Sequence, residues 1–271
     1  MIKENYVKEY VEKSIKEHWD YEAMTDYGSK PQTYGDIGIH IARLHLMFEE
    51  CGMQKGDKVA VIGKNSTNWA IVYLAAVSFG AVIVPILPDF HPNDIHHIVN
   101  HSDSVALFIS DNIWDKIDEG KIPKVKVITS LKDWKILIES NKDEIQKIYD
   151  RLDQLFEEKF TEGFSQETLQ FDEISNDELG VLSYTSGTTG FSKGVMLPLN
   201  SLAANVRFAR KSMDLKPKDN MVSFLPLAHA FGCAFDFLYP FSMGAHIHFL
   251  SRTPTPQIVL KAFADFPLSP K

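Results

Sequence analysis

Cysteine is scarce in this chain, and so are the features that mark secreted proteins. Cys51 and Cys233 are the only 2 cysteines among 271 residues, and they lie far apart without a CxxC pair. No disulfide framework is therefore expected, and a reducing cytoplasm is the simpler compartment. The N-terminus, MIKENYVKEYVEKSIKEHW, lacks the apolar core of a signal peptide and instead predicts an amphipathic surface helix.

A basic surface is also lacking. Lys and Arg number 28 against 36 Asp and Glu, which gives a formal net charge of -8. Nucleic-acid binding needs basic side chains that displace counterions, so this balance disfavours a nucleic-acid partner. A small anion is still compatible with the sequence, because one lysine and a few backbone N–H groups can hold a phosphate locally.

One uncharged run, WAIVYLAAVSFGAVIVPIL at residues 69–87, has the length of a membrane-spanning helix. Three helix-capping residues, Asn65, Ser66 and Asn68, precede or open it, Gly80 interrupts it, and a β-branched run follows the glycine. This order predicts a buried helix, a turn and a buried strand, with a transmembrane helix as the alternative. A peripheral contact with a membrane stays open.

Strand-like apolar runs alternate with helix-like periodic segments along most of the chain. The expected strands are KVAVIG (58–63), AVIVPI (81–86), VALFIS (105–110), VKVIT (125–129) and LGVLSY (179–184). A helix opened by Pro92, Asn93 and Asp94 lies between two of them. Such alternation predicts an α/β fold with a parallel sheet, crossover helices and both sheet faces covered.

The composition divides the chain into three parts. Residues 1–130 form a first α/β portion, residues 131–176 a charged helical linker, and residues 177–271 a second portion. The linker carries apolar residues at helical spacing among many charges, which is typical of a solvated helix face. A partner-binding helix is the alternative.

The stretch YTSGTTGFSKGV, which follows the last predicted strand, combines glycines, hydroxyl side chains and a lysine. No two glycines stand two residues apart, so the dinucleotide fingerprint G-x-G-x-x-G is excluded. A P-loop is excluded as well, because Lys193 does not directly follow Gly190. G-x-S-x-G is absent too, so a hydrolase nucleophile elbow is not supported. The residues themselves suit either a phosphate-binding loop or a Thr-rich polar turn.

Together with its flanking blocks, this stretch resembles the signature of the adenylate-forming superfamily, which includes acyl-CoA synthetases, luciferase and peptide-synthetase adenylation domains. The pair YTSGTTGFSKGVML and LPLAHAFG is most similar to long-chain fatty acyl-CoA synthetases. The resemblance covers nearly the whole chain. It implies the parallel-sheet α/β subdomains of the family's N-terminal AMP-binding domain, ending before the C-terminal domain.

The resemblance implies a ligase of fatty acid metabolism. ATP and Mg²⁺ convert a fatty carboxylate to an acyl-adenylate, and coenzyme A then takes the acyl group as a thioester. The residues that match the family's phosphate-binding loop are Thr185, Ser186, Gly187, Thr188, Thr189, Gly190 and Lys193. Thr185 is also the implied Mg²⁺ contact. Ser192 stands where the family usually has proline, which frees the backbone there, and phosphate binding is expected to survive.

His229 matches the family position beside the acyl carboxylate and the α-phosphate, where it could donate to developing negative charge. A hydrogen-bonded core histidine is the alternative. Phe231, Gly232 and Cys233 match residues that line or gate the acyl tunnel, and plain core is the alternative. Cys233 has no charged neighbour in sequence to depress its pKa, so a thiol nucleophile is not expected.

Two histidine groups raise the question of a metal. His97 and His101 stand four apart beside His96 without the Glu of H-E-x-x-H, so a solvated helix face is expected and zinc is the alternative. His246 and His248 alternate in AHIHFL and are expected to share one face of a strand.

The family's later motifs for adenine, ribose and the adenylation lysine have no match in this chain. The tail, KAFADFPLSPK, does not complete an element. We therefore expect an N-terminal fragment of a long-chain fatty acid–CoA ligase that is inactive alone. A short, non-catalytic module that binds a nucleotide or a partner is the alternative.

Overall fold

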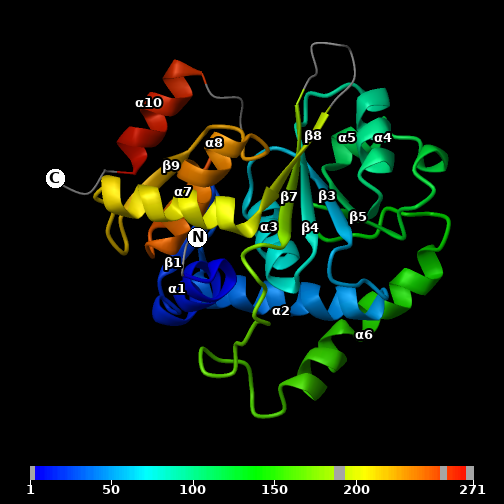
Figure 1. Cartoon of the computed structure of the whole chain (residues 1–271), viewed down its shortest axis with the longest axis horizontal. Helices are drawn as coiled ribbons and strands as arrows, with labels where there is room; N and C mark the ends of the chain where they lie inside the picture. The colour runs from blue at the N-terminus through cyan, green and yellow to red at the C-terminus, as the bar shows by residue number, and fades with distance from the viewer. Residues whose placement is uncertain (1–3, 186–192, 251–254, 267–271) are drawn as a thin grey trace.

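Two β-sheets and their helices make up the fold, which a computed structural model describes for residues 4–185, 193–250 and 255–266 (Figure 1). The larger sheet has the strand order β6 (Val127–Ser130), β5 (Ser104–Ile109), β3 (Lys58–Ile62), β4 (Val82–Ile86), β7 (Leu179–Thr185) and β8 (Lys193–Pro198). Every neighbouring pair is parallel except β7 and β8. The prediction of a parallel α/β sheet is confirmed, and all five expected strands are present in it.

The smaller sheet was not predicted as a unit. Its order is β2 (Gln32–Thr33), β1 (Glu22–Asp26), β10 (His246–Phe249) and β9 (Asn220–Ser223). Strand β10 runs parallel to both β1 and β9. These strands are only two to five residues long and come from opposite ends of the chain, so the sequence shows no alternation of apolar and polar residues long enough to predict them.

Helix α3 (Thr67–Phe79) is the centre of the core. It contains the first part of the uncharged run considered above, residues 69–79, and all its residues except Asn68 and Phe79 are buried. A helix that is apolar all round must be enclosed by protein. Helix α3 contacts β3 and β4 of the larger sheet, β1 of the smaller sheet, and helix α2. Ser66 caps its first turn, and Gly80 ends it with a φ of 86°, a conformation that glycine adopts without strain. The expected helix, turn and strand are confirmed.

The N-terminal segment is helical, as predicted, and comprises the π-helical η1 (Tyr6–Glu12) and α1 (Lys13–Glu17). One face is exposed, while Val7 and Ile15 on the other are fully buried in the core. Helix α2 (Tyr34–Glu50) follows, and a capping box of Thr33 and Asp36 fixes where it begins.

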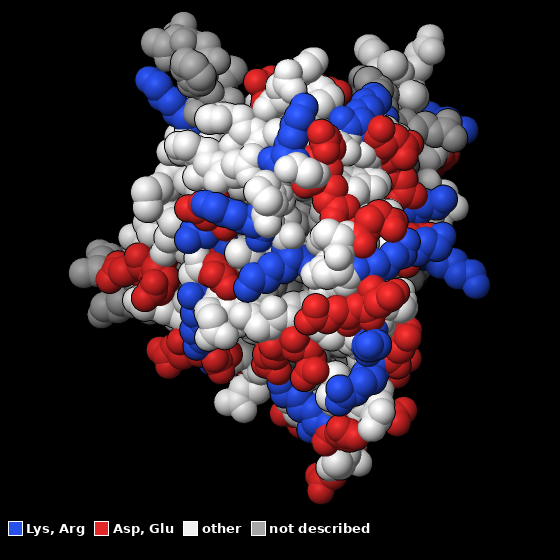
Figure 2. Space-filling model, turned by 90° about the vertical axis from the view of Figure 1, so that its right-hand side faces the viewer, with Lys and Arg blue, Asp and Glu red and all other residues white. Residues whose placement is uncertain are grey.

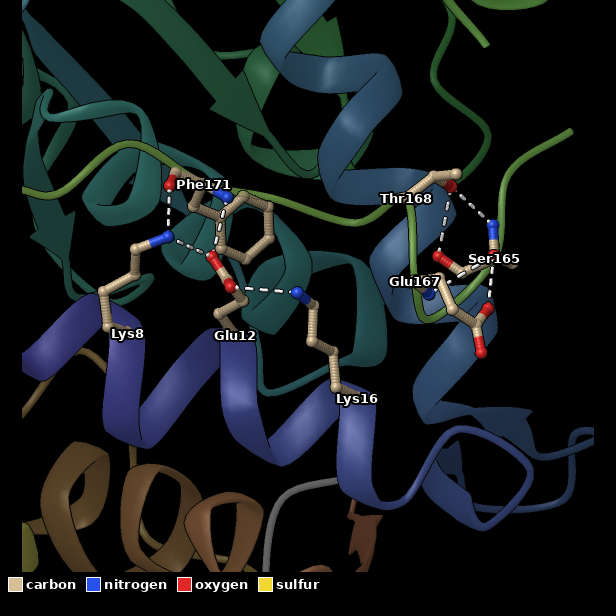
Figure 3. A network of polar contacts seen from close by, with 7 residues as sticks. All are labelled: Lys8, Glu12, Lys16, Ser165, Glu167, Thr168 and Phe171. Atoms are coloured by element: carbon tan, nitrogen blue, oxygen red, sulfur yellow. Dashed lines mark hydrogen bonds and ion pairs between the residues drawn. The ribbon is translucent and has the colours of Figure 1, made fainter. Parts of the chain in front are cut away.

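Glu12 connects the N-terminal helices to the segment at Phe171, which follows the charged linker helix (Figure 3). Its carboxylate lies 2.8 Å from Lys8 Nζ and 3.1 Å from Lys16 Nζ, and it accepts a 2.8 Å hydrogen bond from the backbone N–H of Phe171. Lys8 Nζ also donates to the Phe171 carbonyl oxygen. One acidic side chain thus joins two segments about 160 residues apart.

Helix α6 (Lys142–Lys159) is the helix expected in the charged linker. One face packs along α2 instead of standing free in solvent (Figure 1). Arg43 and Asp153 form an ion pair of 2.8 Å, and Tyr149 Oη lies 2.8 Å from Thr129 Oγ1. Ile145 is the one fully buried residue of the helix.

The remaining helices are α4 (Pro92–His101), α5 (Asp111–Trp114), η2 (Glu119–Lys121), α7 (Leu199–Ser212), α8 (Ala230–Gly232), η3 (Cys233–Leu238), α9 (Tyr239–Ser242) and α10 (Pro256–Asp265). In the described ranges, none of the helices is both long and apolar enough to cross a membrane. On the face shown in Figure 2, acidic and basic side chains alternate without gathering into a patch of one sign.

Candidate functional site

The predicted phosphate-binding stretch connects two paired strands. Strands β7 and β8 are antiparallel, and Thr185 at the end of β7 stands opposite Lys193 at the start of β8. Both residues are exposed. The hydroxyl and the ammonium group that the resemblance assigns to phosphate therefore belong to cross-strand neighbours, the last residue of β7 and the first of β8. Figure 1 shows these two strands side by side.

Part of the predicted site cannot be placed. Ser186, Gly187, Thr188, Thr189, Gly190 and Ser192 lie outside the residues that the structure describes, between Thr185 and Lys193.

Tyr184 anchors the hairpin to helix α4. Its side chain is 6% exposed, and its hydroxyl lies 2.7 Å from His101 Nδ1. Because side chains alternate along a strand, Ser183 and Thr185 point to the opposite face from Tyr184. Tyr184 therefore packs toward α4, and Ser183 and Thr185 lie on the other face of β7.

The segment Leu225–Ala228, which leads into His229, is held by two polar side chains. Asn65 donates to the carbonyl oxygen of Leu225 at 2.7 Å and accepts from the N–H of Leu227 at 3.0 Å. The carboxylate of Asp236 accepts from the N–H groups of Phe224 and Leu225 at 3.1 and 3.0 Å. Burial raises the pKa of Asp236, and the two backbone donors partly offset this.

His229 is exposed, so the core-histidine alternative is wrong. It caps helix α8, and its Nδ1 accepts a 3.3 Å hydrogen bond from the N–H of Phe231. In the neutral imidazole the proton then lies on Nε2, which leaves Nε2–H as a donor toward solvent or a ligand.

The three predicted acyl-site residues have different surroundings. Phe231 is 57% exposed and packs on Phe235, with ring centroids 4.7 Å apart. Gly232 is buried, and a Cβ at this position would lie only 2.4 Å from the carbonyl oxygen of Pro226, so the backbone here requires glycine. Cys233 is buried, and burial raises the pKa of its thiol to about 12, which agrees with the expectation that it is no nucleophile.

An apolar cavity of about 130 Å³ lies beside this segment. Strand β7 contributes Val181 and Ser183, and Cys233 lines it from η3. Ala228 and Ala230, the two neighbours of His229, also line it. The structure therefore brings β7 and the His229 segment to one apolar cavity, which Cys233 lines while Phe231 and Gly232 do not.

Comparison with known proteins decides the family. The sequence profile described as AMP-binding enzyme matches residues 11–268. The chain belongs to the AMP-binding enzyme family.

Its relatives in this family include acyl-CoA synthetases. The chain is 29% identical over 206 residues to the putative acyl-CoA synthetase YngI of Bacillus subtilis, covering 72% of this chain and 37% of the relative. It is 32% identical over 202 residues to fatty acyl-CoA synthetase A of Dictyostelium discoideum, covering 73% and 29% respectively. The chain therefore spans well under half the length of these relatives.

A solved structure, ATP-bound MatB from Rhodopseudomonas palustris, has the same fold. It superposes with a TM-score of 0.74 at 20% identity, over 96% of this chain and 48% of that one. The chain thus has the fold of about half of a larger adenylate-forming enzyme.

The histidine groups of this family member do not form a metal site in the described part of the chain. Over residues 4–185, 193–250 and 255–266, no three His, Cys, Asp or Glu side chains could hold an ion. His96 Nε2 accepts from the N–H of Asp118 at 3.0 Å, and His101 is bonded to Tyr184. The zinc alternative is therefore not supported there. His246 and His248 do share one strand face, with ring centroids 3.9 Å apart, as predicted.

Proposed function

We propose that this chain binds the phosphates of ATP between Thr185 and Lys193 and presents a fatty carboxylate to His229. The observation that carries the proposal is the cavity that joins β7 to both neighbours of His229. Because β7 ends at Thr185, one strand connects the phosphate side of the site to the carboxylate side.

The proposed chemistry has two steps. In the whole ligase, a carboxylate oxygen forms a bond to the α-phosphorus while the bond to pyrophosphate breaks. The coenzyme A thiol then loses its proton to solvent and its sulfur bonds to the acyl carbon while the bond to AMP breaks. Lys193 and the hydroxyl of Thr185 stabilise the charge that develops on pyrophosphate, and Nε2–H of His229 donates to an oxygen at the reacting centre. The Thr185 hydroxyl is a hard oxygen donor that fits Mg²⁺, which supplies charge neutralisation when bound with ATP.

The cavity beside Cys233 has a mainly apolar wall that suits the first carbons of a fatty acyl chain, because its volume of about 130 Å³ is close to that of a cavity that holds one benzene ring. Cys51 and Cys233 are both free thiols, which favours the cytoplasm as the compartment.

We infer that residues 1–271 do not complete adenylation alone and bind ATP weakly. The family's adenine and ribose motifs have no match in this sequence, and the chain spans about half of the solved relatives. Binding of a nucleotide without catalysis is the second candidate that this observation favours.

Calorimetric titration with Mg²⁺–ATP tests the phosphate site. Replacing Lys193 with Ala should weaken binding about tenfold, because a charge-assisted contact is lost. Lys142→Ala, which changes an exposed lysine of α6, should leave binding unchanged. Equal affinity of wild type and Lys193→Ala would refute the phosphate site. Palmitate-dependent pyrophosphate exchange at the rate of an intact ligase would refute the inferred inactivity.

A further inference from the structure

A separate cavity lies where helix α6 packs against helix α2. Its volume is about 200 Å³, and its apolar wall includes Leu44, Met47, Trp134 and Leu152. An engineered apolar cavity of about 150 Å³ is known to bind benzene, so this one has room for a substituted benzene ring. It shares no lining residue with the cavity beside Cys233.

Arg43 lines this cavity. Its Nη2 pairs with Asp153 Oδ1 at 2.8 Å, and its guanidinium carbon lies 5.2 Å from the centroid of the Phe156 ring. The Nε atom is buried and has no hydrogen-bond partner in the described part of the chain. A buried donor without an acceptor is costly, and because the Arg43 side chain is 42% exposed, a turn of the guanidinium toward the cavity would let a ligand supply the acceptor.

Trp134 is held in an unusual conformation at the cavity. Its φ is 63°, which is rare for a bulky side chain. The indole lies nearly parallel to the ring of His40, with centroids 6.3 Å apart and an interplanar angle of 26°, and it meets Phe108 edge-on. Burial, and then the charge of Arg43, lowers the pKa of His40, so its ring is neutral at pH 7. Two flat neutral rings thus border the cavity.

We propose that this cavity binds a small aromatic carboxylate, with the ring against Trp134, Leu44 and Met47 and the carboxylate accepting from the Arg43 guanidinium. A carboxylate is the acceptor that best matches a guanidinium. Asp153 is no obstacle, because its side chain is 81% exposed and can turn into solvent. This binding site is independent of the ATP and fatty-acid site proposed above.

Benzoate is the probe, and toluene is the matched ring without an acceptor. In ¹H–¹⁵N NMR spectra, benzoate should shift the Trp134 indole N–H signal, which is assigned by its loss in Trp134→Gly. Arg43→Met keeps the aliphatic stem and should weaken benzoate binding about tenfold while leaving toluene binding unchanged. Arg207→Met on α7 is the matched control and should bind both probes as wild type does.

The proposal would be overturned by an unmoved Trp134 signal, by equal benzoate affinity of wild type and Arg43→Met, or by loss of the titration in Ser201→Leu. Ser201 lines the other cavity, so that last result would place benzoate there. Trp134→Gly suits a φ of 63° and should fold, yet it should lose both probes. Benzoate binding to Trp134→Gly can be detected by shifts of the remaining indole signals. If this variant still bound benzoate, the assigned site would equally be contradicted.

Discussion

The side-chain amide of Asn65 donates a 2.7 Å hydrogen bond to the carbonyl oxygen of Leu225, 160 residues further along the chain. Asn65 follows strand β3 of the larger sheet, and Leu225 follows strand β9 of the smaller one. This contact therefore ties the segment that leads to His229 to the end of a central strand.

Replacing Asn65 with Ala should destabilise the fold by about 1–3 kcal/mol, because the Leu225 carbonyl and the Leu227 N–H both lose their partner. Urea unfolding measures the change. Asn112→Ala, at an exposed position of α5, should alter stability by less than about 0.5 kcal/mol. Equal stability of the two variants would contradict the role assigned to Asn65.

Glu12→Gln should lower stability at pH 7 by about 1 kcal/mol or more, because a charge-assisted network is lost. Burial alone would raise the pKa of Glu12, but hydrogen bonds from Lys8, Phe171 N–H and Lys16 lower it overall. Stability from a lowered carboxyl pKa is present above the unfolded value, about 4.3, and is lost as the pH falls through the folded value.

The difference between wild type and Glu12→Gln should therefore shrink as the pH is lowered from 5 toward 3, measured by urea unfolding at each pH. Glu9→Gln, on the same helix, removes an exposed pair with Lys13 and should cost less than about 0.5 kcal/mol. A Glu12→Gln difference that stays constant with pH would show that the charge contributes nothing.

His248 should make the fold sensitive to acid. Burial, and then the neighbouring His246, lowers the pKa of His248 to about 3. An unfolded histidine binds a proton below about pH 6.5, so between about 6.5 and 3 only the unfolded state is protonated and stability falls as the pH falls. The slope is at most about 1.4 kcal/mol per pH unit for this group.

Replacing His248 with Gln should flatten the dependence of unfolding free energy on pH across that window. His45, whose pKa burial lowers to about 4, acts in the same direction and remains in the variant. His97→Gln, on the exposed side of α4, is the control. An unchanged slope in His248→Gln would exclude His248 as a source of acid sensitivity.

Gly232→Ala should destabilise the segment after His229, because the added Cβ would lie 2.4 Å from the Pro226 carbonyl oxygen, a backbone atom that cannot turn away. We expect a loss of about 1–3 kcal/mol in thermal or urea unfolding. Gly120→Ala, where the nearest atom is a side-chain oxygen at 3.3 Å, should cost less. If both variants were equally stable, the close approach at Gly232 would have no energetic consequence.

The parallel sheet could be predicted because each of its five predicted strands is a short apolar run bounded by turn residues. Strand β8 was missed as a strand, since its exposed Val195 and Met196 follow directly on the loop and carry no clear period. Because β8 was not predicted, its antiparallel pairing with β7, which places Thr185 opposite Lys193, could not be predicted either.

Motif matching predicted His229 and Lys193 as site residues, but it did not identify the side chains that hold the segment before His229. Asn65 was interpreted as a candidate helix cap. Asp236 lies within an apolar run, and a single carboxylate there does not indicate which backbone N–H groups it accepts from. Both act through backbone groups more than ten residues away. The cavity at Arg43 could not be predicted from the sequence either, because it depends on how α6 packs against α2.

The pairing of β1 with β10 constrains how the chain can fold during synthesis. Met24 pairs with Ile247, so 223 residues separate the partners (247 minus 24). At about 5–20 residues per second, Ile247 is added roughly 10–45 s after Met24. Strands β3, β4 and β5 are close in sequence and can pair early, as β1 can with β2, whereas the pairing of β1 with β10 must wait. The first strand of the chain is thus among the last to be paired along both of its edges.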